Sequence, residues 1–176
     1  MSALRLRPGF LMVGTIEPRK GHLQVIQAFE MLWDRGVEIN LIIVGREGWM
    51  HLADSQRRTI PETVARIRRH PRLNRRLFWL EGISDQFLQR IYAGSSCLLA
   101  ASEGEGFGLP LIEAAFHGLP ILARRIPVFE EVAGEHACYF TGDRPEDVAE
   151  AVEDWLEMRE KGSLPDPGGL PCLTWK

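Results

Sequence analysis

The chain alternates between short apolar runs and longer segments in which apolar residues recur every three or four positions. The short runs are typical of buried strands, and the periodic segments are typical of helices that cover a core with one face. The expected strands span residues 10–14, 39–45, 77–80, 97–101, 120–123 and 137–140. The expected helices span residues 21–33, 61–69, 84–93, 109–116 and 145–158.

Strands that alternate with helices predict an α/β fold, a doubly wound parallel sheet with helices on both faces. A chain of 176 residues suits one such domain, which we place at residues 1–158. Residues 159–176 are rich in glycine and proline and are expected to form an extended linker or tail. Ligands of open α/β sheets bind beyond the carboxyl ends of the strands, so candidate residues are sought there.

A glycine-rich loop leads directly into one predicted helix within residues 103–113. Its three glycines give access to unusual backbone conformations and let a ligand approach the backbone closely. Pro110 suits the first turn of the helix that follows. Free N–H groups and the positive end of the helix dipole then form an anion site, suited to phosphate. The spacing also fits a glycine-rich turn before an ordinary helix.

Two acids flank this phosphate site. Glu105 lies in the loop and Glu113 falls about one turn into the helix, so they should meet different parts of one ligand. Bound phosphate repels carboxylates, so the acids are better aimed at hydroxyls or at positive charge developing on a sugar ring.

The loop after the first strand, residues 14–21, should lie on the same sheet edge and carries Arg19 and Lys20. These cations could grip the same anion and stabilise a diphosphate leaving group. Two basic residues that merely solvate a helix start are the alternative, although cations there oppose the helix dipole. The loop offers only Gly14 and Gly21, which argues against a GxGxxG dinucleotide site.

Composition narrows the classes of function. The net charge of −3 gives no reason to expect nucleic-acid binding. The cysteines, at positions 97, 138 and 172, show no metal-binding spacing and indicate a reduced compartment without structural disulfides. Neither a signal sequence nor a membrane-spanning run is evident, so a cytoplasmic protein is expected.

Three segments together resemble a known family. They are Gly14-Thr with Pro18-Arg-Lys-Gly, Glu81-Gly-Ile-Ser-Asp, and Glu105-Gly-Phe-Gly-Leu-Pro-x-x-Glu113. Over residues 10–156 the chain resembles the retaining glycosyltransferases of family 4, the glycosyl transferases group 1. The resemblance implies the C-terminal, Rossmann-like domain of a GT-B enzyme, which binds the nucleotide-sugar donor while the N-terminal domain binds the acceptor.

The resemblance also implies roles for individual residues. Arg19 and Lys20 would bind the donor diphosphate, and Glu105 would lie beside the transferred sugar as a positioning and electrostatic residue; these three form the expected catalytic set. Glu113 would accept hydrogen bonds from the ribose. The remaining donor-binding residues would be Gly14 and Thr15 beside the phosphates, Gly82, Ile83 and Ser84 at the nucleobase, and Gly106, Phe107, Gly108 and Leu109 facing sugar and phosphates.

The implied reaction transfers a hexose with retained configuration by a front-side mechanism, without a metal or cofactor. No catalytic role falls to the chain's histidines, at positions 22, 51, 70, 117 and 136. GDP-mannose is the favoured donor, because residues 45–49 and 126–132 are similar to those of bacterial mannosyltransferases. The acceptor would be a glycan or a lipid-linked glycan of polysaccharide synthesis.

The resemblance places the acceptor-binding domain outside this chain. We therefore expect the 176 residues alone to bind donor weakly and to transfer little sugar. A nucleotide-sugar epimerase of the same architecture and a non-catalytic sugar-nucleotide-binding module are the alternatives. The arginine-rich segment 57–76 fits either a solvated helix face or a peripheral contact with anionic lipid at the inner face of the plasma membrane.

Overall fold

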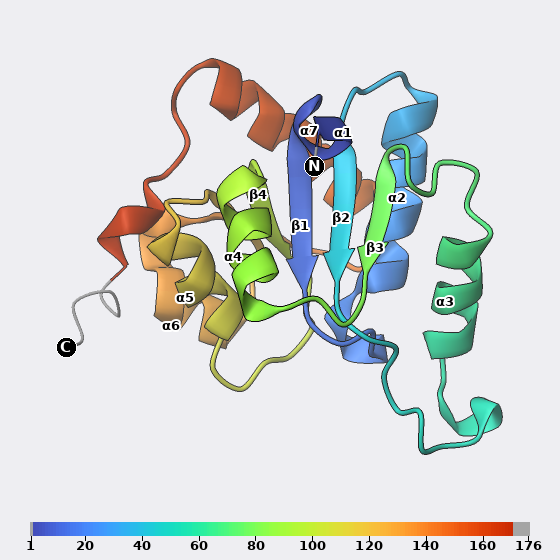
Figure 1. The fold of residues 1–176 in the computed structure, drawn as a ribbon. Coiled ribbons are helices and arrows are strands. Elements are labelled where there is room, and N and C mark those ends of the chain that lie inside the picture. Colours follow the sequence, from blue (N-terminus) through green and yellow to red (C-terminus); the bar gives the residue numbers. More distant parts are fainter. Residues whose placement is uncertain (1, 171–176) are drawn as a thin grey trace.

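The computed structural model describes residues 2–170 and contains one six-stranded sheet (Figure 1). The strands are β1 (Gly9–Val13), β2 (Asn40–Val44), β3 (Leu77–Leu80), β4 (Cys97–Ala100), β5 (Ile121–Arg124) and β6 (Cys138–Phe140). Their spatial order is β3-β2-β1-β4-β5-β6, and every neighbouring pair is parallel. This is the strand order of Rossmann folds, so the expected fold class is confirmed.

Helices connect the strands and cover both faces of the sheet. They are α1 (Ser2–Arg5), α2 (His22–Asp34), α3 (Ile60–Arg68), α4 (Asp85–Gly94), α5 (Leu109–Phe116), α6 (Pro127–Ala133) and α7 (Pro145–Glu160). The predicted strands and helices are all present, with ends shifted by one or two residues. The pattern did not predict α1 or α6, because four and seven residues are too few to show a helical period.

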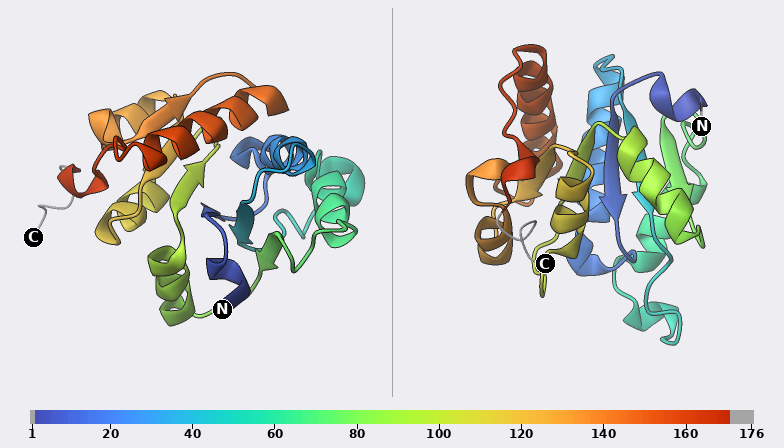
Figure 2. Two further views of the ribbon diagram at one scale, coloured as in Figure 1. Left: turned by 90° about the horizontal axis from the view of Figure 1, so that it is seen from above. Right: turned by 60° about the vertical axis from the view of Figure 1, so that its left-hand side comes forward.

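Alternation along the central strand builds a separate core on each face. Phe10 and Met12 of β1 pack with α2, α3 and α7, whereas Leu11 packs with α4, α5 and α6. The Phe10 ring meets those of Phe29 and Trp155 edge-to-face, with centroids 5.5 and 5.0 Å apart. Figure 2 shows the helices on either side of the sheet. A strand covered on both faces must be apolar throughout, as β1 is.

The strand order reverses between β1 and β4, and this sets the position of the site. The connection from β1 leads to α2 on one face, and the connection from β4 leads to α5 on the other. The two strands therefore lead to opposite faces of the sheet at its carboxyl edge, where open α/β sheets bind ligands in a crevice. In Figure 1 this edge is the lower end of the molecule.

The loops after β1 and β2 touch at a pair of glycines. Gly14 donates its N–H to the carbonyl oxygen of Val44, 2.9 Å away. Gly45 has a φ of 154°, and a Cβ built on it would lie 1.9 Å from the carbonyl oxygen of Gly14. Only glycine fits at position 45 without moving the loop after β1.

The segment after α7 packs against the domain as far as it is described. A 3-10 turn, η4 (Pro167–Gly169), contacts α5, and Leu170 is buried in the same core as Leu11. A ring nitrogen of His136 lies 3.0 Å from the carbonyl oxygen of Asp166. Residues 163–170 thus contribute to the core, while positions 171–176, with Cys172, lie outside the described residues.

Gly45→Ala should lower the free energy of unfolding by about 1–3 kcal/mol, because the added methyl group meets backbone that cannot retreat. Urea denaturation followed by circular dichroism measures the change. Gly104→Ala is the matched control, since no atom lies within 4 Å of a Cβ at Gly104. Equal stability of the two variants would contradict the close contact.

Candidate functional site

Two loops meet at the carboxyl edge of the sheet. The first loop (residues 14–21) follows β1, and the glycine loop (residues 101–108) follows β4. Glu103 donates its backbone N–H to the carbonyl oxygen of Arg19 at 2.8 Å. Gly21, with a φ of 76°, sits so close to Ala101 that a Cβ would come within 2.5 Å of the Ala101 carbonyl oxygen. The backbone itself therefore holds the two loops together.

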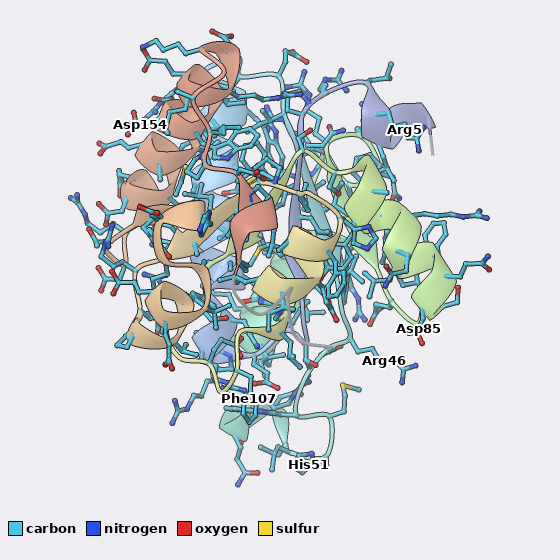
Figure 3. All side chains as sticks on the ribbon, turned by 90° about the vertical axis from the view of Figure 1, so that its left-hand side faces the viewer. Arg5, Arg46, His51, Asp85, Phe107 and Asp154 are labelled. Atoms are coloured by element: carbon cyan, nitrogen blue, oxygen red, sulfur yellow. The ribbon has the colours of Figure 1, made fainter. Side chains whose placement is uncertain are left out.

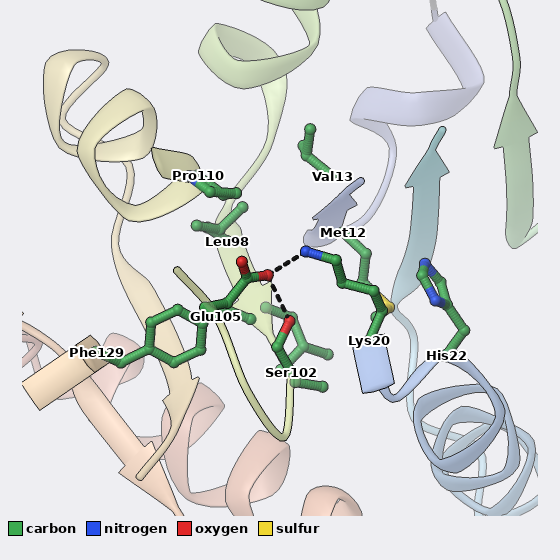
Figure 4. Close-up of a pocket in the computed structure, with 12 residues that line it drawn as sticks. Met12, Val13, Lys20, His22, Leu98, Ser102, Glu105, Pro110 and Phe129 are labelled. Carbon is green, nitrogen blue, oxygen red and sulfur yellow. Dashed lines mark hydrogen bonds and ion pairs between the residues drawn. The ribbon is translucent and has the colours of Figure 1, made fainter. Parts of the chain in front are cut away.

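An ion pair joins the side chains of the same loops (Figure 4). Lys20 Nζ donates to Glu105 Oε1, and Ser102 Oγ donates to the same oxygen at 2.9 Å. The side chains of Lys20 and Glu105 are only 14% and 12% exposed. Burial acts to raise the pKa of Glu105, but the hydrogen bonds from Lys20 and Ser102 outweigh it and hold that pKa below its ordinary value. Glu105 is thus an ionised carboxylate in a fixed position.

Among residues 2–170, hydrogen-bond donors contact only one oxygen of Glu105. Both donors contact Oε1, and none from residues 2–170 forms a hydrogen bond to Oε2. The second oxygen is therefore available to a ligand.

Arg19 lies beside this pair but is more open. Its side chain is 53% exposed, and its Nε lies 3.2 Å from Glu17 Oε2. Its Nη1 reaches the carbonyl oxygen of Gly104 at 3.5 Å. The sequence placed Arg19 and Lys20 within reach of one anion, and the structure brings both to the glycine loop.

The second acid has a different environment. Glu113 projects from α5, and its Oε2 accepts a hydrogen bond from the Tyr92 hydroxyl at 2.6 Å. Tyr92 belongs to α4 and is 1% exposed. Glu105 and Glu113 therefore have separate partners, one cationic and one neutral.

The glycines of the glycine loop do not all serve the same purpose. Gly108, at the N-terminus of α5, has a φ of 66°, which favours glycine. Gly104 and Gly106 have no such φ and have open space where a Cβ would be. The expectation of unusual backbone conformations is thus correct at Gly108 and wrong at the other two, which instead leave the backbone accessible.

Two apolar side chains of this region face solvent. Phe107 is 78% exposed and Leu109 is 59% exposed. Figure 3 shows Phe107 standing out at the same end of the molecule as Arg46. Both apolar side chains are therefore open to contact beside the polar side chains of the site.

The third predicted segment follows β3 at the same edge. Ser84 caps α4, its Oγ accepting the backbone N–H of Phe87 at 3.2 Å. Gly82 is exposed with a φ of 61°, and Ile83 packs against the core shared with α4. Gly14 and Thr15 are half-buried at the end of β1, which lies between this segment and the glycine loop.

Three further residues, not expected from the sequence, shape the site. Ser102 supports Glu105, and Tyr92 supports Glu113. Arg124, buried at the end of β5, donates to the carbonyl oxygens of Ala101 and Gly142. The sheet-edge rule would have found Ser102 and Arg124, since both end or follow a strand. No local signal marks Tyr92.

His22 also borders the site, at the start of α2. It lines a cavity of about 20 Å³ with Lys20, Ser102 and Glu105, room for about one water molecule. Neither ring nitrogen has a hydrogen-bond partner among the described residues. Burial and then the charge of Lys20 lower the pKa of His22 to about 4, so the ring is neutral at neutral pH.

Most arginines of the arginine-rich segment form ion pairs with carboxylates of the same domain. Five of its arginines form ion pairs with carboxylates, and Arg66 binds Glu30 through two hydrogen bonds of 2.9 and 2.6 Å.

Within residues 2–170, no helix is long and apolar enough to cross a bilayer, and no group of three or more potential ligand side chains is placed to hold a metal ion.

The fold and the site define a class of α/β domain that carries basic side chains and a helix N-terminus at the sheet's carboxyl edge. Within that class the chain belongs to the glycosyl transferases group 1, whose family model matches residues 7–163. It is 50% identical over all 176 residues to the serotype-specific mannosyltransferase WbdA of Escherichia coli. It spans 20% of that protein's length.

Two further matches are less similar in sequence. The O-antigen chain mannosyltransferase B of Escherichia coli is 29% identical over 126 residues, which are 71% of this chain and 30% of that protein. The C-terminal domain of a group 1 glycosyl transferase, LpcC, from Francisella tularensis superimposes with a TM-score of 0.75. That match has 17% identity and covers 96% of this chain and 86% of the solved domain. It shows a shared fold.

His22→Leu should flatten the dependence of stability on pH. Because the folded pKa of His22 is about 4 and the unfolded pKa is 6.5, only the unfolded chain binds a proton there between these values. Stability therefore rises with pH across this window and is lost as pH falls, by up to about 3 kcal/mol from this group. The leucine variant lacks this loss.

Urea denaturation at pH 7.5 and pH 4.5 tests this difference. His51→Gln is the control, because it removes a histidine that is exposed on the surface. An identical pH dependence in the wild type and in His22→Leu would show that His22 is not buried as a neutral ring.

Proposed function

We propose that this chain is the donor-binding domain of a retaining glycosyltransferase that transfers mannose from GDP-mannose. The acceptor is a glycan or a lipid-linked glycan in polysaccharide synthesis. The observation that carries the proposal is the set of Lys20, Glu105 and Ser102, joined directly beside the N-terminus of α5. The choice of mannose rests on the 50% identity to an Escherichia coli mannosyltransferase.

The donor diphosphate binds between the basic pair and the glycine loop. Arg19 and Lys20 supply positive charge from one side, and the first N–H groups of α5 supply it from the other. Gly106, Phe107, Gly108 and Leu109 line this second side. Gly104 and Gly106 have open space around them, so the diphosphate can approach the backbone. Gly14 and Thr15 line the cleft below it.

The transferred sugar lies against Glu105. Lys20 and Ser102 fix the carboxylate through Oε1, so Oε2 accepts a hydrogen bond from a sugar hydroxyl. Its lowered pKa keeps this group ionised, and its charge favours the positive charge that develops at the anomeric carbon. Glu105 acts here by position and charge, not as a nucleophile.

The proposed reaction exchanges one bond at the anomeric carbon for another on the same face. The bond to the diphosphate oxygen breaks as the bond to the acceptor oxygen forms. The acceptor hydroxyl passes its proton to the departing diphosphate, whose charge Arg19 and Lys20 neutralise. The facing domain that presents the acceptor is a required partner in this scheme, and peripheral membrane contact would come with a lipid-linked acceptor.

The nucleoside end of the donor extends toward α4 and α5. Glu113 accepts hydrogen bonds from the ribose, and residues 82–84 border the base. The solved HepE protein of Anabaena, in complex with UDP-glucose, has the same fold, with a TM-score of 0.72 and 17% identity over 93% of this chain and 43% of that one. That complex supports nucleotide-sugar binding as the use of such a domain.

Isothermal titration of the chain with GDP-mannose, GDP, UDP, ADP and pyrophosphate tests the assignment. GDP-mannose and GDP should bind more tightly than the other nucleotides. Absence of binding by every nucleotide would refute the donor-binding role, and preference for UDP or ADP would refute the donor but not the class. Nucleoside diphosphate release by the whole protein, with and without acceptor, separates transfer from epimerisation.

Lys20→Met should weaken GDP binding by about 10- to 100-fold, the range expected for one charge-assisted contact. Wild-type affinity should fall more steeply with added salt than that of the variant. Lys161→Met is the matched control, because Lys161 pairs with Glu157 on the surface of α7. Thermal midpoints establish that each variant is folded. Unchanged affinity in Lys20→Met would remove the lysine from the diphosphate site.

Glu105→Gln should separate sugar recognition from nucleotide recognition. Losing the carboxylate removes a strong acceptor for the sugar hydroxyl but also releases Lys20 for the diphosphate. We therefore expect the ratio of GDP-mannose affinity to GDP affinity to fall several-fold, while GDP binds at least as tightly as before. Titration with both ligands gives this ratio, and an equal loss for both would contradict the assignment.

A further inference from the structure

Tyr92 is a buried residue whose side-chain hydroxyl reaches the candidate site. It lies near the end of α4, packed in the core with a 1% exposed surface. Its hydroxyl donates to Glu113 Oε2 at 2.6 Å, within the range of a strong hydrogen bond to a carboxylate. A phenylalanine would fill the same space, so packing alone does not require the hydroxyl.

The Tyr92 ring is itself fixed from a second direction. His117, just after α5, stacks on it with centroids 5.3 Å apart and an angle of 6° between the planes. A ring nitrogen of His117 lies 2.5 Å from Gln89 Oε1, which ties the stacked ring back to α4. The phenol is therefore held between α4 and α5 with its hydroxyl directed at Glu113.

The hydrogen bond determines which oxygen of Glu113 is available. Tyr92 occupies Oε2, and within residues 2–170 no hydrogen bond reaches Oε1. Burial, together with the charge of Glu113, raises the pKa of Tyr92 far above its ordinary value, so the hydroxyl remains a donor. A neutral donor also leaves the full negative charge on Glu113, which a cation would have cancelled.

We propose that Tyr92 is a positioning residue that orients Glu113 to recognise the vicinal diol of the nucleotide ribose. This inference rests on the donor-binding function proposed above. Tyr92 holds one carboxylate oxygen, so the other faces the ligand without a loss of side-chain entropy on binding. Removing the hydroxyl lets the Glu113 side chain move and weakens recognition of the diol, while the diphosphate contacts stay intact.

The test compares GDP with 2′,3′-dideoxy-GDP, which lacks the diol. The wild-type chain should prefer GDP by about 10-fold or more, since the diol gives charge-assisted hydrogen bonds. Tyr92→Phe should reduce this preference several-fold and leave the affinity for pyrophosphate unchanged. Tyr139→Phe is the matched control, because its hydroxyl donates to the Gly134 carbonyl oxygen at 2.7 Å, away from the site.

A double-mutant cycle separates positioning from general damage to the fold. In a Glu113→Ala background, Tyr92→Phe should cause no further change in the preference for GDP. Full wild-type preference in a folded Tyr92→Phe chain would overturn the inference, as would an equal effect of Tyr92→Phe with and without Glu113. A wild-type chain that binds no GDP would instead overturn the proposed function, and thermal midpoints identify any variant that does not fold.

Discussion

The ion pair between Lys20 and Glu105 is the interaction on which the arrangement of the site's charged side chains depends. It links the loop after β1 to the loop after β4, where the strand order of the sheet reverses. Both side chains are largely withdrawn from water, and a buried charge is stable only with a partner. The crevice between the loops is consequently set before any ligand arrives, which reduces the ordering cost of binding.

The two acids of the site are held in the same way, each through one carboxylate oxygen, but by different donors. A protein donor holds one oxygen of each carboxylate, and the other oxygen is free among the described residues. Glu105 is held by a cation and a hydroxyl at one oxygen, so its charge is partly compensated. Within the described part of the chain, Glu113 is held only by a neutral phenol. The difference suits one acid to a position beside phosphates and the other to a position beside neutral hydroxyls.

Much of this could be predicted from the pattern of the chain. Short apolar runs predicted the strands, and helical spacing predicted the long helices, because burial restricts those positions to apolar residues. Glycines and cations at strand ends located the two main loops. The pairing of Tyr92 with Glu113 could not be predicted, because it depends on how α4 packs beside α5. Helix α6 was missed since seven residues begin and end within two turns.

Arg124 connects three segments of the domain. One guanidinium group, fixed at the end of β5, ties the start of the glycine loop to the loop that precedes α7 and to Gln24 of α2. Three segments from both faces of the sheet thus share a single anchor. A change in the loop before α7 can therefore alter the start of the glycine loop through Arg124, whereas the side chains of Phe107 and Leu109 are exposed to solvent.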